Sequence, residues 1–271
     1  MHVVARVFYP KQSPILQGIA SSPLRGFSQR RSFYPVEIGH SLEVRGIGRA
    51  RACDKIHAMR VGLLMSLIAA LAFGCALPTT AGSTQKFPSG TILFKDDFSS
   101  PVSGWDHTKY AQGIMDYFEG GYRMQVNAPD LNLWSTVHKD FTDVRIEADT
   151  GKFGGPDENR IGLICRSVGS NYYFFIISSD GYYGLGLFDQ GQAKLLGQEQ
   201  MKESQSIHTG MAVNHLRMDC QGDRLTGFVN GLQLAQAHDG TLLHGDAGLL
   251  AGTFKTSGAD ILFDNFVVFA P

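Results

Sequence analysis

Hydrophobic and polar side chains alternate most regularly in the middle of the chain, between residues 159 and 188. In the first run of this stretch, Ile161 and Leu163 are two residues apart and lie on one face, as side chains do at the two-residue period of a β-strand. The second run is apolar on both faces and rich in aromatic and β-branched residues, as a central strand is. Asp180-Gly181 then supplies a tight turn before a third run. The pattern predicts three consecutive antiparallel strands.

Short runs of this kind continue from residue 91 to the end of the chain. Val144 and Ile146 alternate with Arg145 and Glu147, which predicts a strand with one face in solvent. Asn230-Gly231 is a strong signal for a hairpin turn. About a dozen such runs, without a convincing amphipathic helix, predict an all-β domain over residues 91–271, folded as a two-sheet antiparallel sandwich.

The first 58 residues lack any such pattern. They carry nine Lys or Arg and three Asp or Glu, a net charge of +6, so a whole-chain charge of −1 leaves about −7 for the remainder. The basic residues are scattered rather than clustered, which argues against an arm that binds nucleic acid. Four prolines and the lack of a sustained period indicate disorder rather than a domain.

Residues 59–75 have the features of an export signal. Arg60 follows Met59, and an unbroken apolar run then leads to small residues and a proline. Because such a signal acts only at an N-terminus, we expect translation to start at Met59 and residues 1–58 to be a mis-assigned upstream extension. The run is shorter than the roughly 20 apolar residues of a transmembrane helix, so a membrane span is less favoured, as is a buried core helix.

The end of this signal predicts attachment of lipid. Leu71-Ala72-Phe73-Gly74-Cys75 resembles the bacterial lipobox, in which the cysteine is diacylated and becomes the mature N-terminus, although Phe73 is bulkier than usual there. Thr79-Thr80-Ala81 is a rival cleavage site, which would release a soluble secreted protein. Residues 76–90 are typical of a flexible tether. We expect a lipoprotein of the cell envelope, in the periplasm or at the cell surface, held at the membrane by its N-terminal lipid.

Two cysteines fall in the predicted sandwich, Cys165 and Cys220. Each lies in a strand-like run on the same face as its apolar neighbours. In an oxidising compartment they form a natural disulfide across 55 residues, worth roughly 2–4 kcal/mol. The alternative is that both are small buried hydrophobic residues. The bridge is the favoured prediction.

Several short motifs resemble one superfamily. They are DDF and GW near residue 100, Gly162-Leu163-x-x-Arg166, YYFFI, Asn214-His215-Leu216, Cys220-Gln221-Gly222, Val229-Asn230-Gly231 and FDNF. Together they resemble the concanavalin A-like lectin/glucanase superfamily, and within it the 3-keto-disaccharide hydrolase domain family and laminin-G-like modules. The resemblance covers residues 93–269 and implies a jelly-roll sandwich of the kind found on exported bacterial proteins. These motifs are structural, so they indicate fold and leave activity open.

The resemblance can be tested for catalysis. Family 16 glycosidases of this superfamily carry E-x-D-x-x-E on one strand; here Glu147-Ala148-Asp149 matches its beginning, and Lys152 stands in place of the second Glu. A retaining two-carboxylate mechanism needs a nucleophile and an acid about 5 Å apart, so the sequence leans toward a domain that is not an enzyme. Glu147 and Asp149 are then expected on a solvated strand face. Hydrolysis of the 3-keto-disaccharide hydrolase type remains the alternative.

Carbohydrate binding requires aromatic rings beneath the apolar faces of sugars, and planar polar side chains at their hydroxyl groups. The candidates are Trp134, Tyr172, Tyr182 and Tyr183, with Arg166 and Asn171 as polar partners. Any one of these rings could instead belong to the core. Tyr172 and Tyr173 point to opposite faces of their strand, so one of the two is expected to be buried.

The resemblance also implies a structural Ca²⁺ between the first and last strands, with Asp97 and Asp264 as candidate ligands. The alternative is that both carboxylates cap turns or bind neighbouring backbone. The combined prediction is an exported, lipid-anchored jelly roll that binds carbohydrate or another cell-envelope ligand without catalysis. A glycoside-processing hydrolase and a laminin-G-like adhesion module are the alternatives, and the oligomeric state is left open.

Overall fold

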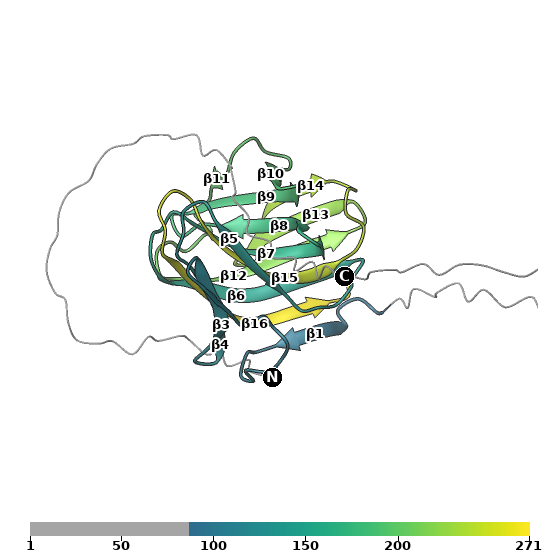
Figure 1. Cartoon of the computed structure of the whole chain (residues 1–271). Helices are drawn as coiled ribbons and strands as arrows, with labels where there is room; N and C mark the ends of the chain where they lie inside the picture. The colour runs from purple at the N-terminus through teal and green to yellow at the C-terminus, as the bar shows by residue number, and fades with distance from the viewer. Residues whose placement is uncertain (1–86) are drawn as a thin grey trace, which may run out of the picture. The chain divides into compact units, whose positions relative to one another are not determined.

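The computed structural model describes residues 87–271, which form sixteen β-strands and no helix (Figure 1). Nothing in this part of the chain is a helix long and apolar enough to cross a membrane. The predicted signal of residues 59–75, the lipid attachment site Cys75 and residues 76–86 of the tether lie outside the described residues.

The strands belong to two sheets. Sheet A contains β1 (Ile92–Asp96), β2 (Thr108–Tyr110), β3 (Gly113–Phe118), β4 (Gly121–Val126), β6 (Val144–Gly154), β12 (Val213–Gln221), β13 (Arg224–Val229), β14 (Leu232–His238) and β16 (Ala259–Phe269). Sheet B contains β5 (Asn132–Thr136), β7 (Asn159–Val168), β8 (Asn171–Ile177), β9 (Tyr182–Asp189), β10 (Gln192–Leu195), β11 (Lys202–Glu203) and β15 (Asp246–Thr253).

The order of strands in sheet A is β14-β13-β12-β6-β16-β4-β3-β2, with β1 paired to β16. In sheet B it is β10-β9-β8-β7-β15-β5, with β11 paired to β9. Every named pair is antiparallel, and β7, β8 and β9 form the predicted meander. The predicted all-β, two-sheet antiparallel sandwich is confirmed.

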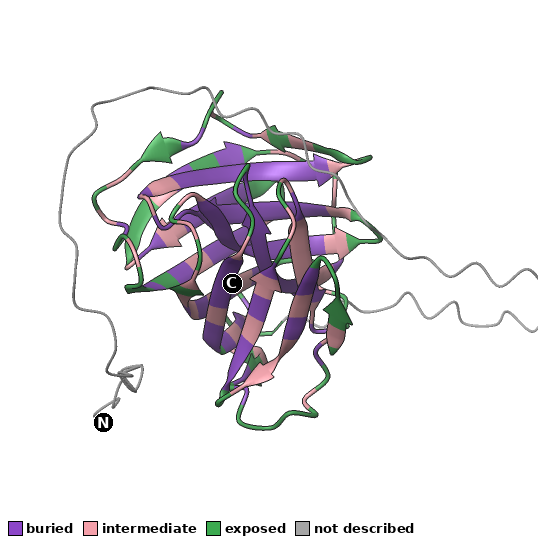
Figure 2. Ribbon diagram, turned by 60° about the vertical axis from the view of Figure 1, so that its left-hand side comes forward, coloured by how far each residue is buried: buried purple, intermediate pink, exposed green. Residues whose placement is uncertain are grey.

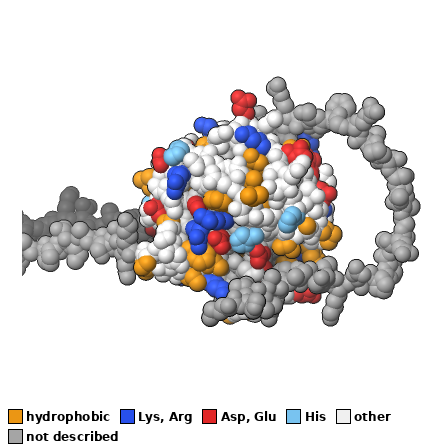
Figure 3. Space-filling view, turned by 180° about the vertical axis from the view of Figure 1, so that it is seen from behind, with side chains coloured by type: hydrophobic (Ala, Val, Ile, Leu, Met, Phe, Trp, Pro, Cys, Tyr) orange, Lys and Arg blue, Asp and Glu red, His pale blue; other side chains and the backbone are white. Residues whose placement is uncertain are grey.

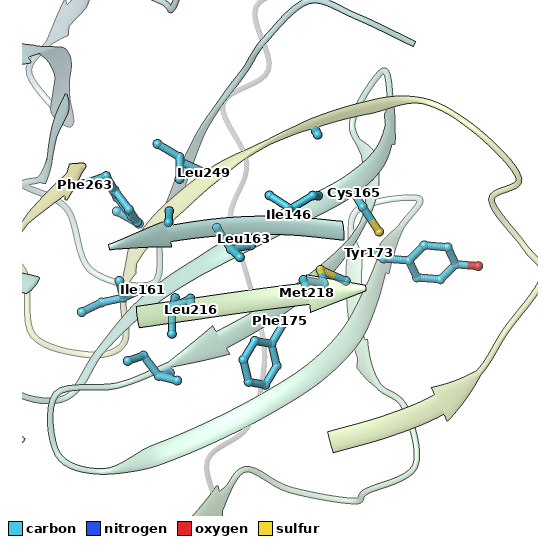
Figure 4. Close-up of a cluster of buried hydrophobic side chains, with 14 of the residues drawn as sticks. Ile146, Ile161, Leu163, Cys165, Tyr173, Phe175, Leu216, Met218, Leu249 and Phe263 are labelled. Atoms are coloured by element: carbon cyan, nitrogen blue, oxygen red, sulfur yellow. The ribbon is translucent and has the colours of Figure 1, made fainter. Parts of the chain in front are cut away.

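The hydrophobic core lies between the two sheets. Ile146 and Met218 of sheet A pack with Leu163 and Phe175 of sheet B in one buried cluster (Figure 4). Buried residues alternate with more exposed ones along β6, as its sequence predicts, whereas β8 is buried on both faces from Tyr172 onward (Figure 2). The outer side of sheet B therefore also carries a layer of buried side chains.

A disulfide joins the two sheets. Cys165 of β7 is bonded to Cys220 of β12, and both residues are buried in the core. The predicted bridge is confirmed. A covalent link between sheets constrains the unfolded chain over the 55 residues that separate the two cysteines.

Arg166 lies beside this bridge and acts as a clamp between loops. Its guanidinium donates to the carbonyl oxygens of Thr142, Gly222 and Leu242 and lies 3.1 Å from a carboxylate oxygen of Asp143. Simple alternation places Arg166 on the outer face of β7, but the register shifts after Cys165, and Arg166 adopts a left-handed φ of 51°. This bulge turns the side chain into the sandwich, where it is 1% exposed.

Candidate functional site

The outer face of sheet B carries a second hydrophobic layer. Its buried members are Ile164, Tyr172, Phe174, Ile176, Phe188, Met201, Leu250 and Phe254. Trp134 and Tyr182 pack against them and are partly exposed. Tyr173 belongs to the inner core, so the two tyrosines point to opposite faces as expected, and not one but both of them are buried.

Side chains on this face converge although their strands are separated. Trp134 is on β5 and Tyr172 on β8, with β15 and β7 between them, and the register places Trp134 level with Ile176, four residues along β8 from Tyr172. Their ring centroids are nevertheless 5.4 Å apart, and the Tyr172 ring stacks on Phe188 at 5.2 Å. The two side chains therefore lean toward each other along the surface of the sheet.

Glycines on the same face make room for the larger side chains. A Cβ added to Gly186 would lie 2.3 Å from Cζ of Phe174, and one added to Gly252 would lie 2.2 Å from Oδ1 of Asn132. Neither position accepts a side chain without a shift of its neighbours. The rings and polar groups of this face therefore lie directly over the sheet backbone.

One arginine is built into this aromatic layer. Arg160 of β7 is 1% exposed, and its Nη1 donates to Oδ1 of Asn132 at 2.9 Å. The two residues lie on strands either side of β15, opposite Gly252, so the hydrogen bond passes over that glycine. The guanidinium carbon lies 4.1 Å from the centroid of the Phe254 ring. Burial lowers the pKa of Arg160 to about 10, while the charge of Asp130 acts in the opposite direction.

A small hollow opens in this face. It is lined by Asn132, Arg160, Tyr172, Phe174, Ile176, Phe188, Ala193 and Leu250, and it contains about 220 Å³ of space, part of it open to solvent. The cavity volume that compares with those of other proteins is about 10 Å³, close to the space of one water molecule. A whole sugar therefore does not enter the hollow, and a ligand on this face would lie over it, against mostly apolar walls with one amide and one cation.

Three of the six residues predicted to bind a ligand lie on this face: Trp134, Tyr172 and Tyr182. The other three lie elsewhere. Tyr183 packs into the inner core, and Arg166 holds loops at the disulfide. Asn171 begins β8, where its Oδ1 accepts a hydrogen bond from the backbone N–H of Gln190. Tyr183 and Arg166 are therefore part of the packing of the sandwich.

The outer face of sheet A carries charged side chains instead. Three cross-strand pairs of opposite charge connect β6 and β12: Arg145 with Asp219, Glu147 with Arg217, and Asp149 with His215. Seen from the side opposite to Figure 1, the molecule shows Lys or Arg, Asp or Glu and His side chains lying beside one another (Figure 3). Opposite charges on neighbouring strands stabilise a sheet modestly, so this face needs no ligand for its charges to be balanced.

His215 lies between two carboxylates. Its Nδ1 is 2.7 Å from Oδ1 of Asp149, and its Nε2 is 3.6 Å from Oε2 of Glu147. The bond with Asp149 and then the contact with Glu147 raise the pKa of His215 to about 9. His215 in turn lowers the pKa of Glu147, and hydrogen bonds from His215 and Asn265 outweigh burial to lower the pKa of Asp149.

At neutral pH this cluster is therefore an imidazolium between two ionised carboxylates. A glycosidase of the two-carboxylate type needs one carboxylic acid in its protonated form, and neither Glu147 nor Asp149 supplies it. Lys152, at the position of the missing Glu, directs its ammonium group to Asp157 and to the carbonyl oxygen of Gly155. The arrangement agrees with the solvated strand face expected for Glu147 and Asp149.

The residues proposed for calcium make local hydrogen bonds. Oδ1 of Asp97 accepts from the backbone N–H and the hydroxyl of Ser99 at 3.2 and 2.6 Å, and Oδ1 of Asp264 accepts from the backbone N–H of Asn265. Within residues 87–271 no group of three or more His, Cys, Asp or Glu side chains is placed to hold a metal ion. Calcium takes six to eight oxygen ligands, backbone carbonyls among them, so a calcium site at Asp97 and Asp264 stays a prediction.

The neighbouring Asp96 organises the loop that follows β1. Its carboxylate accepts hydrogen bonds from the backbone N–H of Phe98 at 2.8 Å and from Nε1 of Trp105 at 2.9 Å. Both rings are buried in the core. The DDF and GW motifs are therefore parts of one packing unit, which explains their proximity in the sequence.

No protein-family model matches the chain, and no curated protein matches it in sequence. Solved structures do resemble it. The carbohydrate-binding module CBM66 from Bacillus subtilis superposes with a TM-score of 0.52 at 18% identity, over 62% of this chain and 96% of the module. A Bacillus subtilis protein of unknown function with a galectin-like fold gives 0.50 at 11% identity, over 68% of this chain and 97% of that protein.

The domain is a jelly roll. The matched structures have galectin-like and jelly-roll sandwich folds, and their low identities to this chain establish the shared fold alone. The predicted concanavalin A-like architecture is confirmed at this level. Because one jelly-roll fold supports many activities, the function must be argued from the two outer faces.

Proposed function

We propose that this chain is an exported carbohydrate-binding protein whose ligand lies on the aromatic outer face of sheet B. The observation that carries the proposal is the aromatic layer of that face, with Trp134 and Tyr182 at its margin and the Asn132–Arg160 pair within it. Rings contact the apolar faces of sugars, and a planar amide and a guanidinium bind their oxygen atoms. The likeness to a carbohydrate-binding module supports the same reading.

The proposal includes binding without catalysis. In sheet A, the carboxylates nearest to a glycosidase motif are ionised and held by His215, and Lys152 replaces the second Glu. A glycoside-processing hydrolase is the second candidate, and product analysis separates the two. A laminin-G-like adhesion module is less favoured, because an adhesion surface of that kind calls for a flat apolar face, and this one contains an amide and a guanidinium among its rings.

The first test measures sugar binding by the full-length protein on a glycan array, followed by calorimetry with the best ligand. Trp134→Ala should weaken binding about five-fold or more, because a stacked aromatic ring contributes about 1 kcal/mol or more beyond its contact area. Phe228→Ala is the matched control, since Phe228 is a partly exposed aromatic on the outer face of sheet A. It should leave binding unchanged.

Equal loss in both variants, or no loss in Trp134→Ala, would show that the site lies elsewhere. Circular dichroism must show an intact sandwich for the comparison to count. Release of products from any sugar, at a rate that Glu147→Gln abolishes while the fold survives, would replace the binding proposal with the hydrolase.

We also propose that Cys75 carries the lipid that holds the protein at the cell envelope. The lipobox-like residues before it support this. Expressed in a bacterial host, the protein should partition into detergent, and Cys75→Ala should move it to the aqueous phase. A mature N-terminus at Gly82 would instead establish cleavage after Ala81 and a soluble secreted product.

A further inference from the structure

Among the described residues that line the hollow on sheet B, Arg160 carries the only charge. The hydroxyl groups of a neutral sugar can be bound by amides and hydroxyl groups, so a buried cation at this place points to a more specific ligand. Resting on the carbohydrate site proposed above, we propose that the ligand contains a uronic acid unit whose carboxylate pairs with the guanidinium of Arg160.

Three neighbours set the position of this guanidinium. Asn132 accepts from Nη1 at 2.9 Å, Phe254 lies under the group at 4.1 Å, and Gly252 leaves the space through which the arginine and the asparagine meet. A guanidinium is planar and presents its N–H donors as a fork that matches the two oxygens of a carboxylate. Holding that plane in one orientation favours a planar anion.

The walls of the hollow strengthen such a contact. Tyr172, Phe174 and Phe188 line the hollow with rings beside the arginine, and charge–charge attraction is stronger where water is excluded. Burial lowers the pKa of Arg160 even though the charge of Asp130 opposes this. A bound carboxylate would act in the same direction as Asp130 and stabilise the charged guanidinium.

Sheet A displays the same combination of groups within the protein itself. Arg217 lies 4.4 Å from the Phe228 ring and pairs with Asp219 at 2.6 Å. Arg145 lies 4.4 Å from the Phe269 ring and pairs with Glu147 at 3.1 Å. A ligand carboxylate at Arg160, which lies over Phe254, would make the contact that Asp219 makes with Arg217.

The test begins with wild-type, full-length protein and pairs of ligands that differ only in charge. Oligogalacturonate, oligomannuronate and oligoguluronate are each titrated beside their methyl esters, which keep the sugar but remove the negative charge. Neutral cello- and laminari-oligosaccharides and a sulfated carrageenan oligosaccharide complete the set. At least one uronate should bind about ten-fold more tightly than its ester, the effect of one charge-assisted hydrogen-bonded pair.

Variants then assign the preference to a residue. Arg160→Met keeps an unbranched apolar stem without the guanidinium and should reduce the acid-to-ester preference to about one, while Arg160→Lys should retain part of it through charge alone. Arg217→Met, which removes a guanidinium over a ring on sheet A, is the control and should keep the full preference. If Arg160→Met does not fold, the relative affinities of wild-type protein for acid and ester still decide whether the ligand is a uronate.

The outcomes separate this inference from the site on which it rests. Binding of neutral sugars or esters as tightly as uronates, or binding of the sulfated sugar in preference to uronates, would overturn the uronate inference and leave carbohydrate binding standing. A full acid preference that persists in a folded Arg160→Met variant would also overturn it. No binding of any sugar would overturn the proposed function itself.

Discussion

The two outer faces of this sandwich differ in the kind of side chain that covers them. On sheet A, Arg145, Glu147 and Asp149 lie opposite partners of opposite charge on β12, so every charge meets its complement in partial contact with water. On sheet B, rings cover the strands, and Arg160 is buried among them, bonded to the amide of Asn132 and attracted by the charge of Asp130. The charged face of sheet A needs no ligand to balance its charges. The aromatic face of sheet B, with an amide and a guanidinium within it, offers a ligand both apolar and polar contacts.

The same comparison predicts how stability is distributed. Exposed ion pairs contribute about 0–1 kcal/mol each, because water screens them, whereas a buried aromatic ring contributes about 3–5 kcal/mol. Most of the free energy of unfolding that the outer faces supply should therefore come from sheet B. Four measurements on the two faces and on the bridge between the sheets test this distribution of stability.

The largest expected effect comes from matched truncations. Phe174→Ala on sheet B should lower the free energy of unfolding by about 3–5 kcal/mol, because Phe174 is 4% exposed and fills the space over Gly186. Phe228→Ala on sheet A should cost about 1 kcal/mol, since its ring is partly exposed beneath Arg217. Urea denaturation measures both. Equal losses would show that the two faces do not differ in packing.

The next effect tests the link between the sheets. Replacing both Cys165 and Cys220 by alanine should lower the free energy of unfolding by about 2–4 kcal/mol, because the unfolded chain gains the freedom of a 55-residue loop. Chemical denaturation of the variant and of reduced wild-type protein should agree. A loss below about 1 kcal/mol would mean that the Arg166 clamp alone holds this end of the sandwich.

A smaller effect should appear in the pH dependence of sheet A. The folded-state pKa of His215, about 9, is above its ordinary value of 6.5, so its stabilisation is fully present below pH 6.5 and is lost as pH rises through 9. The pKa values of Glu147 and Asp149 are lowered, so their contribution is present above the ordinary values of 4.5 and 3.8 and is lost in acid.

The melting temperature of wild-type protein should therefore exceed that of His215→Asn most between about pH 5 and 6.5, and the gap should close near pH 9. Because the His215 side chain is 45% exposed, the gap should correspond to no more than about 1 kcal/mol. His238→Asn, at a more exposed contact with Asp223, is the control. A gap that does not change with pH would argue against the His215 cluster as its cause.

The smallest effect is the coupling between Arg217 and Asp219. A double-mutant cycle with Arg217→Met and Asp219→Asn should give about 0.2–1 kcal/mol, and the value should fall at high salt. Coupling well above this range would mean that water screens the Arg217–Asp219 pair less than it screens other partly exposed ion pairs.

Much of the fold could be predicted from local patterns. Alternation identifies β6 and β7, and the turn at Asp180-Gly181 separates β8 from β9. The Cys165–Cys220 bridge was the favoured prediction because two core-facing cysteines were expected in an oxidising compartment, and the structure decides for it over two separate buried thiols. The helical content of residues 87–271 is zero, as the pattern requires.

The site was only partly predictable. Trp134, Tyr172 and Tyr182 were selected for their chemistry and lie together, whereas Tyr183 faces the core. Arg160 was missed because an arginine at the start of a strand is usually solvated. The sequence does contain a signal for Arg160. The positions that share its face on β7, Gly162 and Ile164, are apolar, and a charged residue on an apolar face is unusual.

The sequence by itself determined the all-β sandwich and its central meander, because period, turn chemistry and burial act over a few neighbouring residues. Only the tertiary structure decided which arginine belongs to the site. A bulge after Cys165 turns Arg166 inward, and the strand order of sheet B brings residues of β5 and β8 to the hollow that Arg160 of β7 lines. Bulges and strand order arise from the whole sheet, and no local pattern of side chains encodes where distant strands meet.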